Sequence, residues 1–167
     1  ICPGGLEGLS PALQQPVRQQ GQESAPTVLR ELEIGDECAA ARKRLWDMSE
    51  ELLLATDLRG ALRGASPSVA RYTGLNEAAL RGRCVLDFIH PADLSEVAAE
   101  LRGLWRSAAR ARFEGRVRCT NASWRRVLWT ITPDRAAGHF DIVGRDVTAE
   151  RELADALHRA EEQVRQS

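Results

Sequence analysis

His90 and Asp93 are the two side chains whose types and spacing come closest to a proton-transfer site. A histidine beside an aspartate can act as a general base with an orienting carboxylate. No serine or cysteine nucleophile accompanies the pair in a recognisable motif, however. The alternative is structural, with Asp93 capping a long helix that Pro91 opens. We favour that alternative, predict no catalytic residue, and expect this part of the chain not to be an enzyme.

The four cysteines, Cys2, Cys38, Cys84 and Cys119, are the other candidates for chemistry. None belongs to a CxxC pair, and their spacing matches neither a zinc site nor a disulfide framework. A redox-sensing thiol would need an exposed position that lowers its pKa. We therefore expect free thiols in a reducing cytoplasm and no metal site.

The composition is that of a globular domain with flanking segments. The chain has 167 residues, of which 43% are hydrophobic and 28% charged, and its formal net charge is −1. Arginines are interspersed with acidic residues, so we expect no nucleic-acid surface. No apolar run approaches the roughly 20 residues that a bilayer-spanning helix needs, so we expect no membrane contact.

Residues 1–26, rich in Gly, Pro and Gln, predict a linker or weakly ordered arm. Residues 27–49 are predicted as an N-terminal connector helix, with helical periodicity clearest from about 37 onward. Their apolar side chains recur at spacings of three and four residues, which is typical of a coiled-coil seam. The seam consists of Ile34, Cys38, Ala41, Leu45 and Met48.

Residues 50–147 are predicted to form the folded domain. Two short apolar runs, 51–57 and 61–65, flank a turn and predict a β-hairpin. Helical signals follow, with Ser66 and Asn76 placed to cap two short helices ahead of a longer one.

Three strands are predicted over residues 113–119, 124–132 and 140–147, with Pro133 limiting the second. The short connections between them indicate an antiparallel meander. With the hairpin, this gives an α+β fold with a five-stranded antiparallel sheet and helices on one face.

Residues 148–167 predict a C-terminal helix, with Thr148 as its N-cap. Charged residues fill most of its faces, so the isolated helix would be marginal. Pairing with a second copy would bury its apolar stripe in a coiled coil, so we expect a homodimer formed through both connector helices. The stripe consists of Leu153, Leu157, Ala160 and Val164.

Four segments stand out in order along the chain: 56–60 (TDLRG), 66–74 (SPSVARYTG), 80–93 (LRGRCVLDFIHPAD) and 142–151 (IVGRDVTAER). Taken together, they resemble the PAS family. Two positions depart from the family pattern: Ala65 stands where the family often has Asn, and Asn-Ala-Ser replaces the usual Asp-Gly turn between later strands. The resemblance implies a PAS fold flanked by connector helices.

The resemblance also raises the question of a cofactor. Haem-binding members hold the iron through a histidine in the long helix, and residues 93–107 contain none. Flavin-binding members carry a reactive cysteine near the position of Cys84, but their surrounding Asn, Arg and Gln pattern is absent. We therefore predict no cofactor, neither haem nor flavin.

A small-molecule pocket between the sheet and the helices is the remaining ligand hypothesis, and a simply filled core is the alternative that we favour. The candidate pocket residues are Leu54, Tyr72, Leu86, Phe88, Val117 and Trp129. Trp124 and Trp129 have opposite parity on one strand, so one should face the helices and the other the outer surface of the sheet.

The resemblance implies a sensory and dimerisation domain of a bacterial cytoplasmic signalling protein, with a histidine kinase as its C-terminal output domain. Asp146 and Thr148, at the junction of the last strand and the C-terminal helix, are the predicted signal-transmission residues. The alternatives are a ligand-free protein-interaction module and the input domain of a cyclic-dinucleotide enzyme.

Overall fold

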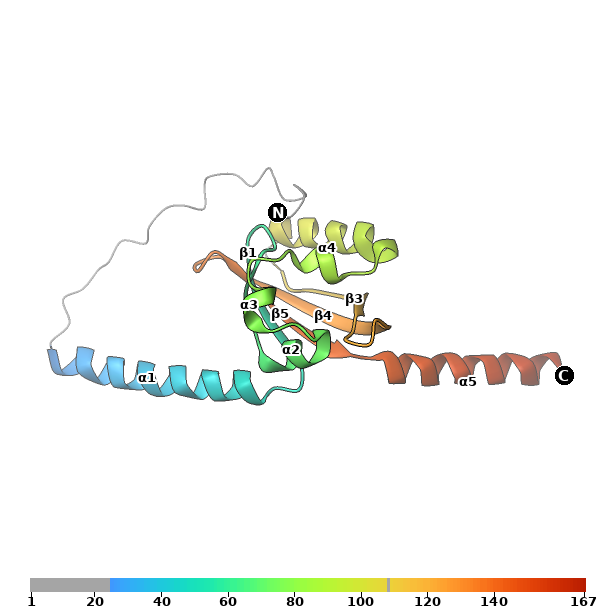
Figure 1. Ribbon diagram of the computed structural model, residues 1–167, viewed down its shortest axis with the longest axis horizontal. Helices are drawn as coiled ribbons and strands as arrows, with labels where there is room; N and C mark the ends of the chain where they lie inside the picture. Colours follow the sequence, from blue (N-terminus) through green and yellow to red (C-terminus); the bar gives the residue numbers. More distant parts are fainter. Residues whose placement is uncertain (1–24, 108) are drawn as a thin grey trace.

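The computed structural model describes residues 25–107 and 109–167, with side chains described from residue 35 onward except at 105. Most of the predicted linker, including Cys2, therefore lies outside the described residues. A single antiparallel sheet with strand order β2-β1-β5-β4-β3 forms the centre of the domain (Figure 1). The strands are β1 Leu52–Asp57, β2 Leu62–Ala65, β3 Ala111–Arg118, β4 Trp124–Asp134 and β5 His139–Asp146.

Short helices and one longer helix cover one face of this sheet. They are α2 Pro67–Thr73, α3 Glu77–Leu80, η2 Val85–Phe88, η3 Pro91–Asp93 and α4 Leu94–Ser107. The predicted α+β architecture, with a five-stranded antiparallel sheet and helices on one face, is confirmed.

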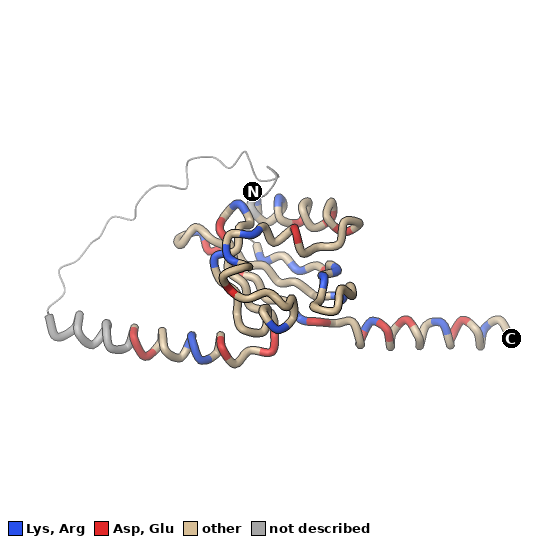
Figure 2. The backbone as a smooth tube through the Cα atoms, in the orientation of Figure 1, with Lys and Arg blue, Asp and Glu red and all other residues tan. Residues whose placement is uncertain are grey.

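Two longer helices flank the domain and extend from it in opposite directions (Figure 1). They are α1 Ala25–Met48 and α5 Thr148–Gln166, so α1 begins well before the periodic stretch from which it was predicted. Neither these nor the other described helices are long and apolar enough to cross a membrane. Figure 2 shows residues of both charge signs spread along α5.

The core lies between the sheet and its covering helices. On β4 the alternate residues Val127, Trp129 and Ile131 are buried, as period-two strands facing a core require. Leu101 and Leu104 of α4 are buried against them from the helical side. The parity argument for the two strand tryptophans holds: Trp129 faces inward and Trp124 is 41% exposed.

Ser66 occupies the N-cap position of α2, as predicted, but its side chain makes no cap hydrogen bond. Asn76 does cap α3, by accepting from the Ala79 N–H at 2.8 Å. The Ser66 hydroxyl instead accepts from the Leu53 N–H at 3.1 Å and bonds to the Ser68 hydroxyl. Both serines are buried, and the Ser68 hydroxyl donates to the Glu51 carbonyl at 2.7 Å. The two hydroxyls therefore hold the start of β1, where an unmade bond would cost more than at an exposed helix end.

Pro133 does not end β4 either, because the strand runs on to Asp134. Pairing with β3 stops at Ile131, which lies opposite Ala111, while pairing with β5 continues past Pro133. At Pro133 β4 therefore has a neighbour on one side only, which is the kind of position that tolerates proline.

Candidate ligand cavity and signalling junction

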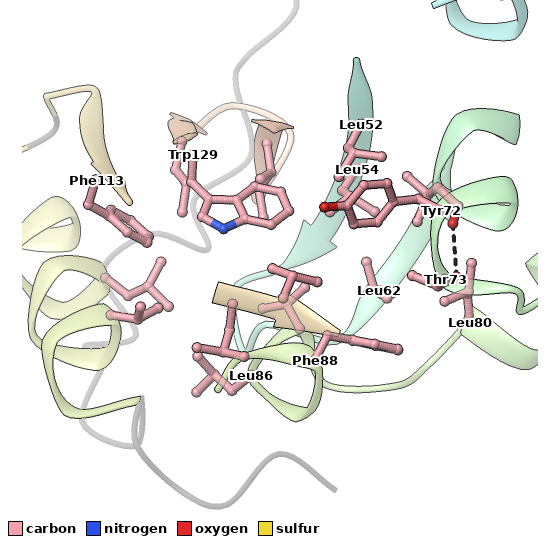
Figure 3. Close-up of a pocket in the computed structure, with 18 residues that line it drawn as sticks. Leu52, Leu54, Leu62, Tyr72, Thr73, Leu80, Leu86, Phe88, Phe113 and Trp129 are labelled. Atoms are coloured by element: carbon pink, nitrogen blue, oxygen red, sulfur yellow. Dashed lines mark hydrogen bonds between the residues drawn. The ribbon is translucent and has the colours of Figure 1, made fainter. Parts of the chain in front are cut away.

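A cavity of about 60 Å³ lies between the inner face of the sheet and the helices. Figure 3 shows its lining side chains, which come mainly from the strands, α2, α3, η2 and α4. All six predicted pocket residues line it: Leu54, Tyr72, Leu86, Phe88, Val117 and Trp129. The same six residues belong to the hydrophobic core or pack against it, so they form the core and also surround a small cavity. Leu52, Leu101 and Phe113 also line the cavity, and the same strand and helix periodicities could have identified them.

The indole of Trp129 is the polar group that stands out in this wall. The side chain is 7% exposed, and its Nε1 is buried without a hydrogen-bond partner among the described residues. Figure 3 shows the nitrogen pointing into the space enclosed by the lining side chains.

Two glycines on the neighbouring strands leave room for this ring. A Cβ at Gly144, directly opposite Trp129 on β5, would lie 2.8 Å from the indole Cε3. A Cβ at Gly115 on β3 would lie 3.6 Å from Nε1. The indole is thus seated across the sheet, with β5 touching its six-membered ring and β3 lying beside its nitrogen.

Tyr72 connects the cavity to the end of β5. Its ring lines the cavity, and its hydroxyl donates to Asp146 Oδ2 at 3.1 Å. Arg125 Nε donates to the same oxygen at 2.9 Å, so one carboxylate oxygen receives bonds from α2 and β4. Burial and the adjacent Asp146 carboxylate raise the pKa of the Tyr72 hydroxyl, which keeps it protonated as the donor.

The other oxygen of Asp146 holds the start of α5. Asp146 Oδ1 accepts from the Thr148 N–H at 2.9 Å. Burial alone would raise the pKa of this carboxyl, but hydrogen bonds from Thr148, Arg125 and Tyr72 bring it below its usual value. The carboxylate is therefore ionised at neutral pH and bonded to three different elements of the fold.

The prediction that Thr148 is the N-cap of α5 is wrong. Val147 occupies that position and makes no side-chain cap bond. Thr148 is the first helical residue, and its hydroxyl accepts from the Arg126 N–H at 2.9 Å. Its role is therefore to fasten the helix to β4, while Asp146 supplies the oxygen for the helix's first N–H.

His90 and Asp93 do not form a base and its orienter. His90 Nδ1 accepts from the Ala92 N–H at 3.0 Å. Asp93 receives the Arg116 guanidinium on both oxygens, at 2.9 and 3.0 Å, together with the Arg116 backbone N–H. The predicted capping role of Asp93 is thus wrong as well: the carboxylate fastens the start of α4 to β3.

The cysteines are the other residues that the sequence offers for chemistry, and none of the described ones lines the cavity. Cys38 is an exposed free thiol, and Cys119 is half-buried with its thiol donating to the Tyr72 carbonyl at 3.2 Å. Cys84 is disulfide-bonded, so the expectation of free thiols is wrong for that residue.

In the part of the chain that the structure describes, one trio of side chains could converge on a metal ion. It consists of Asp134, His139 and Asp141, at the hairpin between β4 and β5. His139 Nε2 already lies 3.0 Å from Asp141 Oδ1, and Asp134 accepts from the Ala137 N–H. These internal bonds account for the cluster without an ion.

The sheet, its covering helices and the cavity define an α+β sensory-domain architecture, and comparison with known proteins agrees. The family model described as the PAS fold matches residues 63–141. The sheet and the helices that cover it therefore form a PAS domain. The comparison with curated proteins finds no match.

Solved PAS structures superpose on most of the described domain. The PAS domain of an HTR-like protein from Haloarcula marismortui matches with a TM-score of 0.59 and 20% identity, over 70% of this chain and 98% of that one. A sensory box histidine kinase/response regulator from Burkholderia thailandensis matches with a TM-score of 0.60 and 22% identity, over 75% and 98%. At these identities the likeness shows the fold.

A third structure carries a bound molecule. The PAS domain of the RpfR quorum-sensing receptor from Cronobacter turicensis, in complex with C12:0, matches with a TM-score of 0.55 and 21% identity, over 60% of this chain and 96% of that one.

Proposed function

We propose that this PAS domain is the sensory and dimerisation module of a histidine kinase, and that it relays the state of its cavity to the output domain through α5. The observation that carries the proposal is the shared carboxylate of Asp146. One oxygen binds Tyr72, whose ring lines the cavity, and the other binds the first N–H of α5.

The relay needs an element with two arrangements that both ends can bias. A ligand that displaces the Tyr72 ring would lengthen its 3.1 Å bond to Asp146 and leave Arg125 as the remaining side-chain donor to Oδ2. The carboxylate would then turn toward Arg125, and the Thr148 N–H would lose its aligned acceptor. The first turn of α5 would change its orientation on the sheet, and the helix would carry that change outward.

The exposed stripe of α5 supports a coiled-coil output. Leu153, Leu157 and Val164 are 65%, 56% and 74% exposed, and no residue of α5 is buried within the single chain. Leu45 and Met48 of α1 are 70% and 76% exposed. Parallel pairing of two chains would cover the α5 stripe, since its spacings of three and four residues match a heptad seam.

The remaining seam residues are less informative on their own. Cys38 and Ala160 are exposed, Ala41 is half-buried, and Ile34 lies in α1 where side chains are not described. A histidine kinase is the proposed output partly because sensory box histidine kinases are among the solved structures of this fold. No cofactor is part of the proposal.

The test uses the full-length protein and measures autophosphorylation of the output domain. Asp146→Ala should uncouple the domain from its output, giving a fixed activity that no longer responds to the input, while circular dichroism shows a folded domain. Tyr72→Phe keeps the ring in the cavity wall and removes only the hydroxyl bond, so it should shift the activity in the same direction.

Thr130→Val is the matched control, because Thr130 is a half-buried strand residue without a side-chain bond to the junction. Unchanged regulation in both Asp146→Ala and Tyr72→Phe would refute the relay. The absence of any autophosphorylation in the full-length protein would refute the histidine-kinase assignment and favour the cyclic-dinucleotide alternative.

A further inference from the structure

The cavity wall offers one hydrogen-bond donor without an acceptor. Trp129 Nε1 is buried and unpartnered among the described residues, whereas the other polar side chains of the wall are engaged. The Tyr72 hydroxyl donates to Asp146, and the Thr73 hydroxyl donates to the Val69 carbonyl at 2.8 Å. A buried donor without an acceptor is costly, so the position of this one points to an acceptor supplied from outside the chain.

The indole cannot easily turn away to find an acceptor elsewhere. The ring lies over the space that Gly144 and Gly115 leave open on the two neighbouring strands, and any side chain at Gly144 would collide with it. The donor is therefore fixed in direction before a ligand arrives, which is the arrangement that favours selective binding.

Water is a poor acceptor in this place. A buried water needs about two to four polar partners, and the remainder of the wall consists of aliphatic and aromatic side chains such as Leu86, Val97 and Ile142. A water bonded to Nε1 would have its other hydrogen-bonding positions facing hydrocarbon. An organic molecule with one acceptor and an apolar body matches the wall better.

The acceptor must also be uncharged. None of the described residues that line the cavity is a lysine, arginine or histidine. A carboxylate placed at Nε1 would be a buried anion with one neutral donor, and the desolvation of such an ion is not offset by a single hydrogen bond. A ketone, ester, lactone or ether oxygen has no such penalty.

On the proposed function, in which this cavity is the input site, we propose that the ligand is a small neutral apolar molecule whose single oxygen acceptor bonds to Trp129 Nε1. The cavity of about 60 Å³ is smaller than the roughly 150 Å³ cavity that holds benzene. A ring-sized ligand must therefore displace half-buried side chains of the wall, such as Leu86 and Phe88 of η2.

The experiment compares two probes of similar shape. Cyclopentanone carries a carbonyl oxygen where methylenecyclopentane carries a methylene group. Binding to the whole chain is followed by NMR at the indole Nε1–H resonance of Trp129, assigned by its loss in Trp129→Phe. Cyclopentanone should move this resonance downfield and bind about tenfold more tightly, equivalent to about 1.4 kcal/mol. Butanoate is the anionic probe and should bind more weakly than cyclopentanone.

In Trp129→Phe the preference for cyclopentanone should disappear while methylenecyclopentane still binds. Equal affinity of the two probes for the unaltered chain, tighter binding of butanoate, or no binding of either neutral probe would overturn the assignment. These outcomes are independent of the relay: a failed probe preference removes the ligand class, whereas unchanged kinase regulation in the Tyr72 and Asp146 variants removes the proposed function.

Discussion

Replacing Gly144 by alanine should displace the indole that forms the middle of the cavity wall. The new Cβ would lie 2.8 Å from Cε3 and 3.0 Å from Cη2 of Trp129, whereas carbon atoms in contact are about 3.5–4.0 Å apart. The backbone at Gly144 cannot retreat, since β5 pairs there with Leu52 of β1 on one side and with Trp129 of β4 on the other. The ring must therefore move into the cavity.

The expected cost combines two opposing effects. Overpacking a well-packed site costs about 1–3 kcal/mol, and replacing a strand glycine recovers about 0.5–1 kcal/mol of backbone entropy. The free energy of unfolding should therefore fall by about 1–2 kcal/mol, and the Tm by roughly 5–10 °C for a domain of this size. Urea and thermal unfolding, both followed by circular dichroism, measure the two quantities.

Gly115→Ala is the matched control. Its Cβ would meet the indole Nε1 at 3.6 Å and Val97 at 3.5 Å, which are ordinary contact distances. Stability should change by less than about 0.5 kcal/mol. If Gly144→Ala is as harmless as Gly115→Ala, or if adding Trp129→Leu does not relieve its penalty in a double-mutant cycle, the seating of the indole on β5 is wrong.

Two further outcomes concern the acid limit of stability and the oligomeric state. Hydrogen bonds from its arginine partner on β3 hold the pKa of Asp93 at about 2, below the ordinary 3.8. The unfolded chain therefore takes up the proton first as the pH falls, and about 1 kcal/mol of stability present above pH 4 should be lost by about pH 2. Asp93→Asn should flatten this acid limb in urea titrations at pH 2–5, and the exposed control Asp87→Asn should leave it unchanged. Leu157→Gln should lower the dimer fraction in analytical ultracentrifugation, whereas Arg159→Gln, on another face of α5, should not; equal dimer fractions would exclude the α5 seam.

The periodic elements could be predicted from the sequence because their signals are local. The alternation around Trp129 predicts which side of β4 is buried, and the stop at Gly74 predicts the end of α2, where the structure has a left-handed glycine. The same local patterns, together with the family resemblance, predict the six candidate pocket residues. Whether they fill the core or leave a cavity depends on the sum of their volumes in three dimensions, which no local pattern contains.

The long-range polar bonds were the part that sequence could not supply. Tyr72 and Asp146 are 74 residues apart, and Asp93 and Arg116 are 23 apart. Each pair forms because the strand order places the β5 end beside α2 and brings β3 beside the start of α4. Cap and turn rules consider only neighbours in the chain, so they predict that Asp93 caps its own helix. In the structure Asp93 bonds instead to Arg116 of the sheet.

Gly144 and Asp146 lie two residues apart on β5. This placement connects the proposed ligand site at Trp129 with the proposed relay from Tyr72 to α5. Opposite Gly144 lies Trp129, and opposite Asp146 lies Val127, so both β5 residues belong to the inner-facing set of the same strand pair. A ligand that moves the indole presses on β5 at Gly144, and one that moves the Tyr72 ring pulls on β5 at Asp146. Both displacements would act on the last four residues before α5, residues 144–147, where Asp146 holds the first helical N–H. On the proposed mechanism, input from either wall of the cavity would reach α5 through one short segment of backbone.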